Sequence, residues 1–253
     1  MIYLADISAC SEEALLPLVC EERKDYAAKY RQDADRIRSL GVAALLGMAL
    51  QTEGYVKQLP VRLTHDENQK PMVDIKSNNL FFSLSHAGNY VAVAVDTKPI
   101  GIDIERIRPY KESLTRRFFS KEEQEILARL SAFLTGDSKD HNTKDHAFTQ
   151  VWTLKESFLK VTGLGLKLGL DTFSIDADPS PDPKQPDGND PYKTRFSYRQ
   201  DHDENTYAGR LLAAPEGYAF GTCFLADSPI LKAGHETEIC YVNLQEWQQI
   251  ILC

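Results

Sequence analysis

The sequence predicts an α+β fold. Three observations support this class: helical periodicity over residues 12–50 and 147–163, alternation of apolar and polar residues over 80–105, and a series of strand-like segments after residue 170. The chain has 253 residues, which is enough for one large domain or two small ones with a buried core.

The first predicted strand is "MIYLADI" at residues 1–7, and the helical stretch 12–50 follows it. Short extended segments come next, before and after a turn at Lys70–Pro71. The stretch "NLFFSLSHAGNYVAVAVD" predicts two strands joined by a turn at residues 87–89. A short turn then leads to the strand "IGIDIE" at residues 100–105. Because so few residues join them, we expect 90–95 and 100–105 to pair antiparallel.

Ser120 followed by Glu123 is a capping box and predicts a helix over 120–132. Residues 135–146 form a predicted polar loop, and 147–163 a second helix that ends at Gly163. The residues spaced to be buried on this helix are Val151, Leu154, Phe158 and Val161. Strand-like segments follow, and the Pro- and Asp-rich stretch 176–191 predicts a surface loop. A short helix is expected to close the chain.

Composition excludes several classes of protein. A net charge of −8 argues against a broad nucleic-acid-binding surface. The longest apolar run, residues 41–50, is too short to span a bilayer, and the first residues lack the basic start of a signal peptide. The five cysteines are scattered, without a CxxC pair. We therefore expect a cytoplasmic protein that binds neither nucleic acid nor membrane.

Asp103 and Glu105 are candidate metal ligands. Residues two apart in a strand share a face, so both carboxylates point the same way. Two such charges repel each other unless one is protonated or a cation lies between them. The alternative is an amphipathic edge strand with a solvated acidic face.

Glu156 and Lys160 lie four residues apart on the second predicted helix, away from its apolar stripe. A third carboxylate beside Asp103 and Glu105 would complete an all-oxygen site suited to Mg²⁺, with Mn²⁺ as an alternative ion. The alternative is an exposed Glu–Lys pair, and spacing alone does not bring residue 156 to residue 105.

Four motifs occur in an order and at separations that resemble the 4′-phosphopantetheinyl transferases of the surfactin-synthetase-activating type. They are "FSLSHAG", "GIDIE", "RFFSKEE" and "WTLKESFLK". The similarity covers roughly residues 1–175.

The resemblance implies a pseudo-dimer of two similar α+β halves, expected at 1–98 and 99–253, with coenzyme A and Mg²⁺ in the cleft between them. It implies transfer of phosphopantetheine from coenzyme A to a serine of an acyl or peptidyl carrier protein, with release of 3′,5′-ADP. It also implies a monomer.

By position in the motifs, the resemblance implies that Asp103, Glu105 and Glu156 hold the metal. One of the two glutamates is expected to act as the base for the carrier serine. Lys160 is expected to stabilise charge on the pyrophosphate, and Lys155 is a second basic candidate. The remaining coenzyme A contacts implied by the resemblance are Arg23, Arg38, Lys70, Pro71, Ser85 and His86.

Three other functions fit parts of the pattern. A metal-dependent phosphoesterase or nuclease could use the same carboxylates and lysine. A non-catalytic module could bind carrier proteins without modifying them, and a structural protein could carry the motifs by coincidence. The coenzyme A residues argue against the first, and the intact carboxylates against the second. Since carrier proteins are typically acidic, the basic stretch 106–121 is the expected partner surface.

Overall fold

The structure is a computed structural model that describes residues 1–66, 70–77, 79–137, 142–177, 192, 194–200, 204–228 and 239–246. The chain forms two compact units. Unit 1 comprises Met1–Thr97 and Thr237–Cys253, and unit 2 comprises Lys98–Glu236. The last segment therefore belongs with the first half of the chain, which differs from the expected second half of 99–253.

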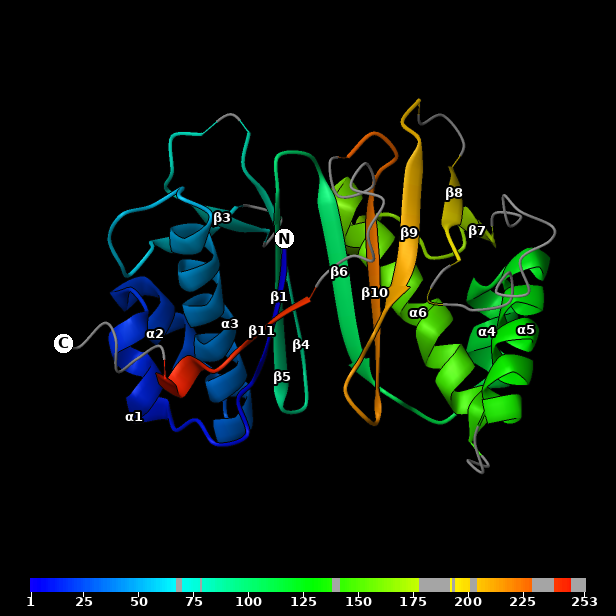
Figure 1. Cartoon of the computed structure of the whole chain (residues 1–253), viewed down its shortest axis with the longest axis horizontal. Helices are drawn as coiled ribbons and strands as arrows, with labels where there is room; N and C mark the ends of the chain where they lie inside the picture. Colours follow the sequence, from blue (N-terminus) through cyan, green and yellow to red (C-terminus); the bar gives the residue numbers. More distant parts are fainter. Residues whose placement is uncertain are drawn as a thin grey trace. The chain divides into compact units, whose positions relative to one another are not determined.

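Unit 1 is a four-stranded sheet with helices along one face (Figure 1). Its strands are β1 (Ile2–Asp6), β4 (Phe81–Ala87), β5 (Tyr90–Asp96) and β11 (Ile239–Val242), with β2 (Leu63–His65) and β3 (Pro71–Val73) as a separate ribbon. Its helices are α1 (Glu12–Leu15), α2 (Glu21–Ala27) and α3 (Asp33–Thr52), with a 3₁₀ turn, η1 (Leu16–Leu18). The predicted helical stretch is thus three helices, and Pro17 lies in the 3₁₀ turn that ends the first.

The sheet of unit 1 has the order β11-β1-β5-β4, with β11 parallel to β1 and the other pairs antiparallel. The predicted pairing of residues 90–95 with 100–105 is wrong. β1 and β4 occupy the two edges of β5, and residues 100–105 pair with a later strand in a different sheet.

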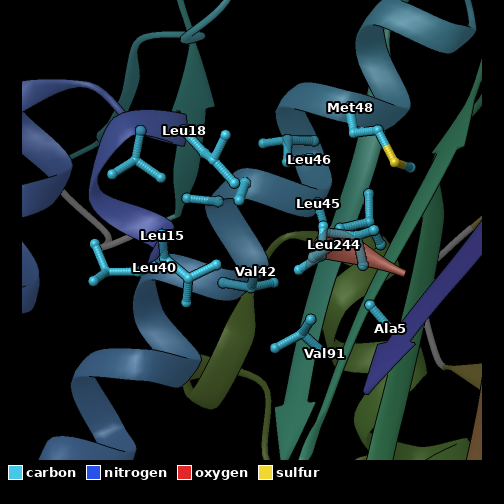
Figure 2. Close-up of a cluster of buried hydrophobic side chains, with 14 of the residues drawn as sticks. Ala5, Leu15, Leu18, Leu40, Val42, Leu45, Leu46, Met48, Val91 and Leu244 are labelled. Carbon is cyan, nitrogen blue, oxygen red and sulfur yellow. The ribbon is translucent and has the colours of Figure 1, made fainter. Parts of the chain in front are cut away.

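The core of unit 1 lies between α3 and the sheet. Residues Ser39–Leu50 of α3 are all buried, so its second half is apolar on nearly every side. Figure 2 shows Val42 and Leu45 of α3 near Ala5 of β1 and Val91 of β5.

Unit 2 is a five-stranded antiparallel sheet of order β6-β10-β9-β8-β7. The strands are β6 (Ile100–Arg106), β7 (Phe173–Ala177), β8 (Phe196–Gln200), β9 (Tyr207–Leu212) and β10 (Tyr218–Leu225). The helices are α4 (Glu112–Phe118), α5 (Lys121–Asp137) and α6 (Thr143–Thr162), with the 3₁₀ turn η2 (Gly165–Lys167). The α+β class is confirmed, and in each unit one 20-residue helix packs on the sheet.

Several local predictions in unit 2 are confirmed. The capping box forms: the Ser120 amide donates to Glu123 Oε2 at 2.7 Å, and the Glu123 amide donates to Ser120 Oγ at 3.2 Å. α6 is followed by Gly163 at φ 71°, a left-handed conformation that favours glycine. Its four predicted core residues are buried.

Two glycines allow α6 to lie directly on the sheet. A Cβ on Gly101 of β6 would lie 2.0 Å from the Ser157 carbonyl oxygen and 2.7 Å from the Val161 amide nitrogen. A Cβ on Gly221 of β10 would lie 3.0 Å from the carbonyl carbon of Thr153. The helix backbone therefore approaches the strands at a distance that any side chain at residue 101 would prevent.

The predicted loop 176–191 lies outside the described residues from 178 onward, as do 138–141 of the polar loop and the end of the closing helix. Within the described parts of the chain, no helix has the length and apolar character needed to cross a membrane.

Candidate active site

The close contact between α6 and β6 brings Glu156 near Asp103 and Glu105. Gly101 faces α6, so residues 103 and 105, two and four positions further along β6, face the same side. The charge of Asp103 acts on both glutamates, and Glu105 acts on Glu156. The three carboxylates thus form one electrostatic group, a proximity that residue spacing alone did not predict.

Two cations neutralise part of this group. Lys160 Nζ donates to Asp103 Oδ1 at 2.8 Å, and Arg108 Nη2 lies 2.5 Å from Glu105 Oε1. The guanidinium of Arg108 also lies over the Trp152 ring, 5.4 Å from its centroid. Arg108 belongs to the stretch 106–121 expected to form the partner surface, but the structure places it beside a carboxylate of the site.

Burial, together with neighbouring negative charge, raises the pKa of two carboxyl groups. Burial is the largest cause for Glu105, followed by the charge of Asp103. Burial is also the largest cause for Glu156, again followed by Asp103. Both glutamates therefore hold a proton more readily than an exposed carboxylate does.

The donor set fits a hard divalent cation in its chemistry. Its three carboxylates offer only oxygen ligands, and a cation would relieve the repulsion that raises the two pKa values. Asp103 and Glu105 are paired with Lys160 and Arg108, however. Across the residues that the structure describes, no three acidic, histidine or cysteine side chains are arranged to hold one ion. Metal binding at this group therefore requires the carboxylates to exchange these cations for the ion.

Lys155 does not join this group, which corrects its predicted role as a coenzyme A contact. Its side chain is fully buried on the other side of α6, where Nζ lies 2.5 Å from Glu123 Oε1 and 3.2 Å from the Phe173 carbonyl oxygen. Glu123 is also fully buried. Burial lowers the pKa of Lys155 and raises that of Glu123, and their ion pair opposes both shifts.

Within unit 1, Arg23 belongs to a group of cations and aromatic rings. Its guanidinium is buried, donates twice to the Ser39 carbonyl oxygen, and lies 5.0 Å from the centroid of Tyr26. The Tyr26 ring stacks on His65 at 4.6 Å, and His65 pairs with Pro71 in the β2–β3 ribbon. Burial lowers the pKa of His65, and the charge of Arg23 adds to the effect.

Arg38 connects α3 to the turn between β4 and β5. Its Nη1 donates to the Gly88 carbonyl oxygen at 3.2 Å, and its Nη2 pairs with Asp35. Ser85, which is buried, and His86, which is exposed, precede this turn on β4. Lys70 is exposed beside Pro71. The structure therefore connects Arg23 to Pro71 through Tyr26 and His65, and it connects Arg38 to the turn that follows Ser85 and His86. The sequence did not predict that Tyr26 and His65 belong to the group around Arg23.

An open pocket in unit 2 lies elsewhere, between the α4–α5 junction and β7. It is lined by Phe118, Phe119, Ser120, Glu122, Asp171, Thr172, Phe173, Ser174 and Arg199. None of the predicted site residues lines it.

Two family models match adjoining parts of the chain. One, described as the 4′-phosphopantetheinyl transferase superfamily, matches residues 99–223. The other, described as 4′-phosphopantetheinyl transferase, N-terminal, matches residues 9–98.

Characterised relatives agree with the family models. The 4′-phosphopantetheinyl transferase ffp of Bacillus subtilis is 31% identical over 164 residues, covering 64% of this chain and 68% of the relative. The 4′-phosphopantetheinyl transferase Sfp of Bacillus subtilis strain 168 is 30% identical over 170 residues, covering 67% and 71%. The chain belongs to the 4′-phosphopantetheinyl transferase superfamily.

As a member of this superfamily the protein is an enzyme. The two alternative hypotheses, a structural protein and a non-catalytic module that binds carrier proteins, are therefore set aside. The stretch matched by the first model, 99–223, includes Asp103, Glu105, Glu156 and Lys160 of this chain, and the stretch matched by the second, 9–98, includes Arg23 and Arg38. The sequence gives only weak signals for Arg108 and Glu123, two residues whose contacts it did not predict. Arg108 is three positions from Glu105, and Glu123 was visible only as part of a capping box.

Proposed function

We propose that this phosphopantetheinyl transferase moves the 4′-phosphopantetheine arm of coenzyme A onto a serine hydroxyl of an acyl or peptidyl carrier protein, with Mg²⁺ or Mn²⁺ as cofactor. The group formed by Asp103, Glu105, Glu156 and Lys160 carries the proposal. It combines two glutamates of raised pKa with a partly exposed ammonium, as transfer of a charged phosphoryl group requires.

In the proposed reaction, the serine hydroxyl of the carrier attacks the pyrophosphate of coenzyme A. The serine oxygen bonds to the β-phosphorus of coenzyme A, and the bond from that phosphorus to the bridging oxygen breaks. The electron pair leaves with 3′,5′-ADP, and the serine proton passes to Glu105 or Glu156, directly or through water. The raised pKa of each glutamate favours proton acceptance, because a carboxylate whose acid has a higher pKa is a stronger base.

Asp103, Glu105 and Glu156 are the residues proposed to hold the divalent ion, which when bound supplies charge neutralisation to the pyrophosphate. Lys160 then shifts from Asp103 toward the leaving group, where its positive charge offsets the charge that develops there. Arg108 is proposed to release Glu105 in the same way. These exchanges need only rotation of side chains that are partly exposed.

Unit 1 is proposed to contribute the cations that bind the phosphates of coenzyme A. Arg38, Lys70 and His86 are proposed as direct contacts, with Ser85 as a hydroxyl donor and Pro71 beside the adenine. Arg23 is proposed to act through its remaining donors, because two of its guanidinium hydrogens already bind Ser39. An acidic chain can thus bind a polyanion through a local cluster of cations. A cytoplasmic, monomeric enzyme remains our expectation.

The test is intact-mass spectrometry of an apo carrier protein incubated with the enzyme and coenzyme A, with Mg²⁺ or with a chelator. We expect a gain of one phosphopantetheine that the chelator abolishes. Asp103→Asn should remove most of the gain, whereas Glu125→Gln, at an exposed carboxylate of α5, should leave it intact. Transfer that survives the chelator would rule out the metal step, and no transfer to either carrier class would overturn the proposed reaction.

Arg116 and Arg117, at the end of α4, test the proposed carrier surface. Arg116 is exposed and pairs with Glu112, and Arg117 lies over the Phe118 ring. Reversing both to Glu is expected to raise the KM for an acidic carrier about tenfold, equivalent to ~1.4 kcal/mol, and to leave the KM for coenzyme A within about twofold.

The matched control reverses Lys57 and Arg129, two exposed cations outside this stretch, to Glu, which changes net charge equally. Steady-state kinetics with varied carrier and fixed coenzyme A measure the effect. Equal losses in the test and control variants would show a general charge effect and no docking surface at residues 106–121.

A further inference from the structure

The ion pair between Lys155 and Glu123 is the most deeply buried charged contact in the described part of unit 2. Both side chains are fully buried, and Phe173 covers Lys155, with its ring centroid 4.3 Å from Nζ. A residue so enclosed does not touch coenzyme A or a carrier. Yet Lys155 directly precedes Glu156 in α6, so its placement bears on the carboxylate group.

Glu123 connects three elements through one carboxylate. Oε1 accepts from Lys155 Nζ of α6 and from the Ile175 amide of β7, at 2.5 and 3.0 Å. Oε2 accepts from the Ser120 amide at the start of α5. Since hydrogen bonds are directional, these contacts fix where the Lys155 ammonium lies relative to α5 and β7.

Fixing Lys155 also fixes the rotation of α6. Successive residues of an α-helix are turned by about 100°, so a lysine held on the β7 side leaves Glu156 and, four residues on, Lys160 on a different side. Gly101 lets the helix lie close to β6 but adds no side chain that could set its rotation.

Stability alone does not explain why the pair between Lys155 and Glu123 is charged. A buried ion pair requires desolvation of two charges, and its replacement by apolar residues of similar volume is often neutral or stabilising. An apolar pair would lack the directional hydrogen bonds that fix where the Lys155 side chain lies. We propose that Glu123 and Lys155 are positioning residues, whose contacts set the rotation of α6 and so hold Glu156 and Lys160 opposite Asp103 and Glu105. This inference rests on the proposed function.

The test is the double variant Glu123→Leu with Lys155→Met, which keeps volume and removes both charges. We expect a folded protein with a lowered Tm, because the amides of Ser120 and Ile175 lose their acceptor. The KM for coenzyme A should stay within about twofold, and kcat per folded molecule should fall about 10- to 100-fold, as it does when reacting groups are slightly misplaced. The matched control is Asp176→Asn with Arg199→Gln, an exposed ion pair between β7 and β8, which should keep the wild-type kcat.

A wild-type kcat in the folded double variant would overturn the positioning role, since a purely structural pair affects only the fraction folded. If the double variant does not fold, Lys155→Arg serves the same test, because it keeps the pair but alters its length. A kcat lowered at unchanged Tm supports the proposal, and an unchanged kcat overturns it. An inactive wild type in the same assay would instead reject the proposed function.

Discussion

Gly101→Ala is expected to destabilise unit 2 by about 3 kcal/mol, the upper part of the range for overpacked sites, and to abolish transfer. The added Cβ would lie 2.0 Å from a backbone oxygen of α6 and 2.7 Å from a backbone nitrogen, so no side-chain rotation relieves the overlap. The helix must move away from β6, and Glu156 moves with it. Chemical denaturation and the mass assay measure the two effects.

Gly221→Ala on the neighbouring strand is the graded comparison. Its Cβ would meet the Thr153 carbonyl carbon and side-chain oxygen at 3.0 Å, a tight contact that a small shift relieves. We expect Gly221→Ala to lower the free energy of unfolding by less than Gly101→Ala does, and to retain part of the transferase activity. Wild-type stability in Gly101→Ala would contradict the direct contact of α6 with β6.

Glu156→Gln is expected to lower kcat at least about 100-fold, within the range for a positioned acid–base group. The same change should stabilise the metal-free protein at neutral pH. It removes a partly buried negative charge that Asp103 and Glu105 repel, at a carboxyl whose pKa lies above the usual value of 4.5. The expected variant is thus more stable and inactive, as measured by Tm in chelator and by the mass assay.

The pH dependence has a definite sign. The unfolded chain ionises Glu105 and Glu156 at their ordinary pKa, whereas the folded chain retains the protons to higher pH. The two groups therefore lower the stability of the metal-free protein as pH rises from about 4.5 through the raised pKa values, and Glu156→Gln should flatten this fall. Glu125→Gln should leave the profile unchanged. An unaltered slope in Glu156→Gln would show that folding does not raise the pKa of Glu156.

Local patterns predicted much of the fold. The capping box at Ser120, the buried stripe of α6 and the two strands around the turn at 87–89 each depend on neighbours within a few residues. The alternation of residues along a strand also predicted that the carboxylates of Asp103 and Glu105 on β6 share one face. The pairing of 90–95 with 100–105 failed because sheet neighbours depend on contacts between distant segments, and β5 is already paired on both sides.

The role of Lys155 shows the same limit at the level of one side chain. Lys155 and Glu156 are adjacent, so which of them faces the core depends on what packs around α6. The partner that settles it, Glu123, lies 32 residues earlier on another helix. Tyr26 and His65 likewise come together only when β2 folds beside α2.

The parallel pairing of β11 with β1 has a consequence for synthesis. Ile2 pairs with Ile239, so the ribosome makes all of unit 2 between the two strands. The sheet of unit 2 uses strands from one continuous stretch and can form as soon as that stretch emerges, whereas β1, once paired with β5, must wait for its second partner, β11, which is translated much later. A nascent chain therefore carries a bare strand edge on unit 1 throughout the making of unit 2, and that interval is when the chain is most open to pairing with other molecules.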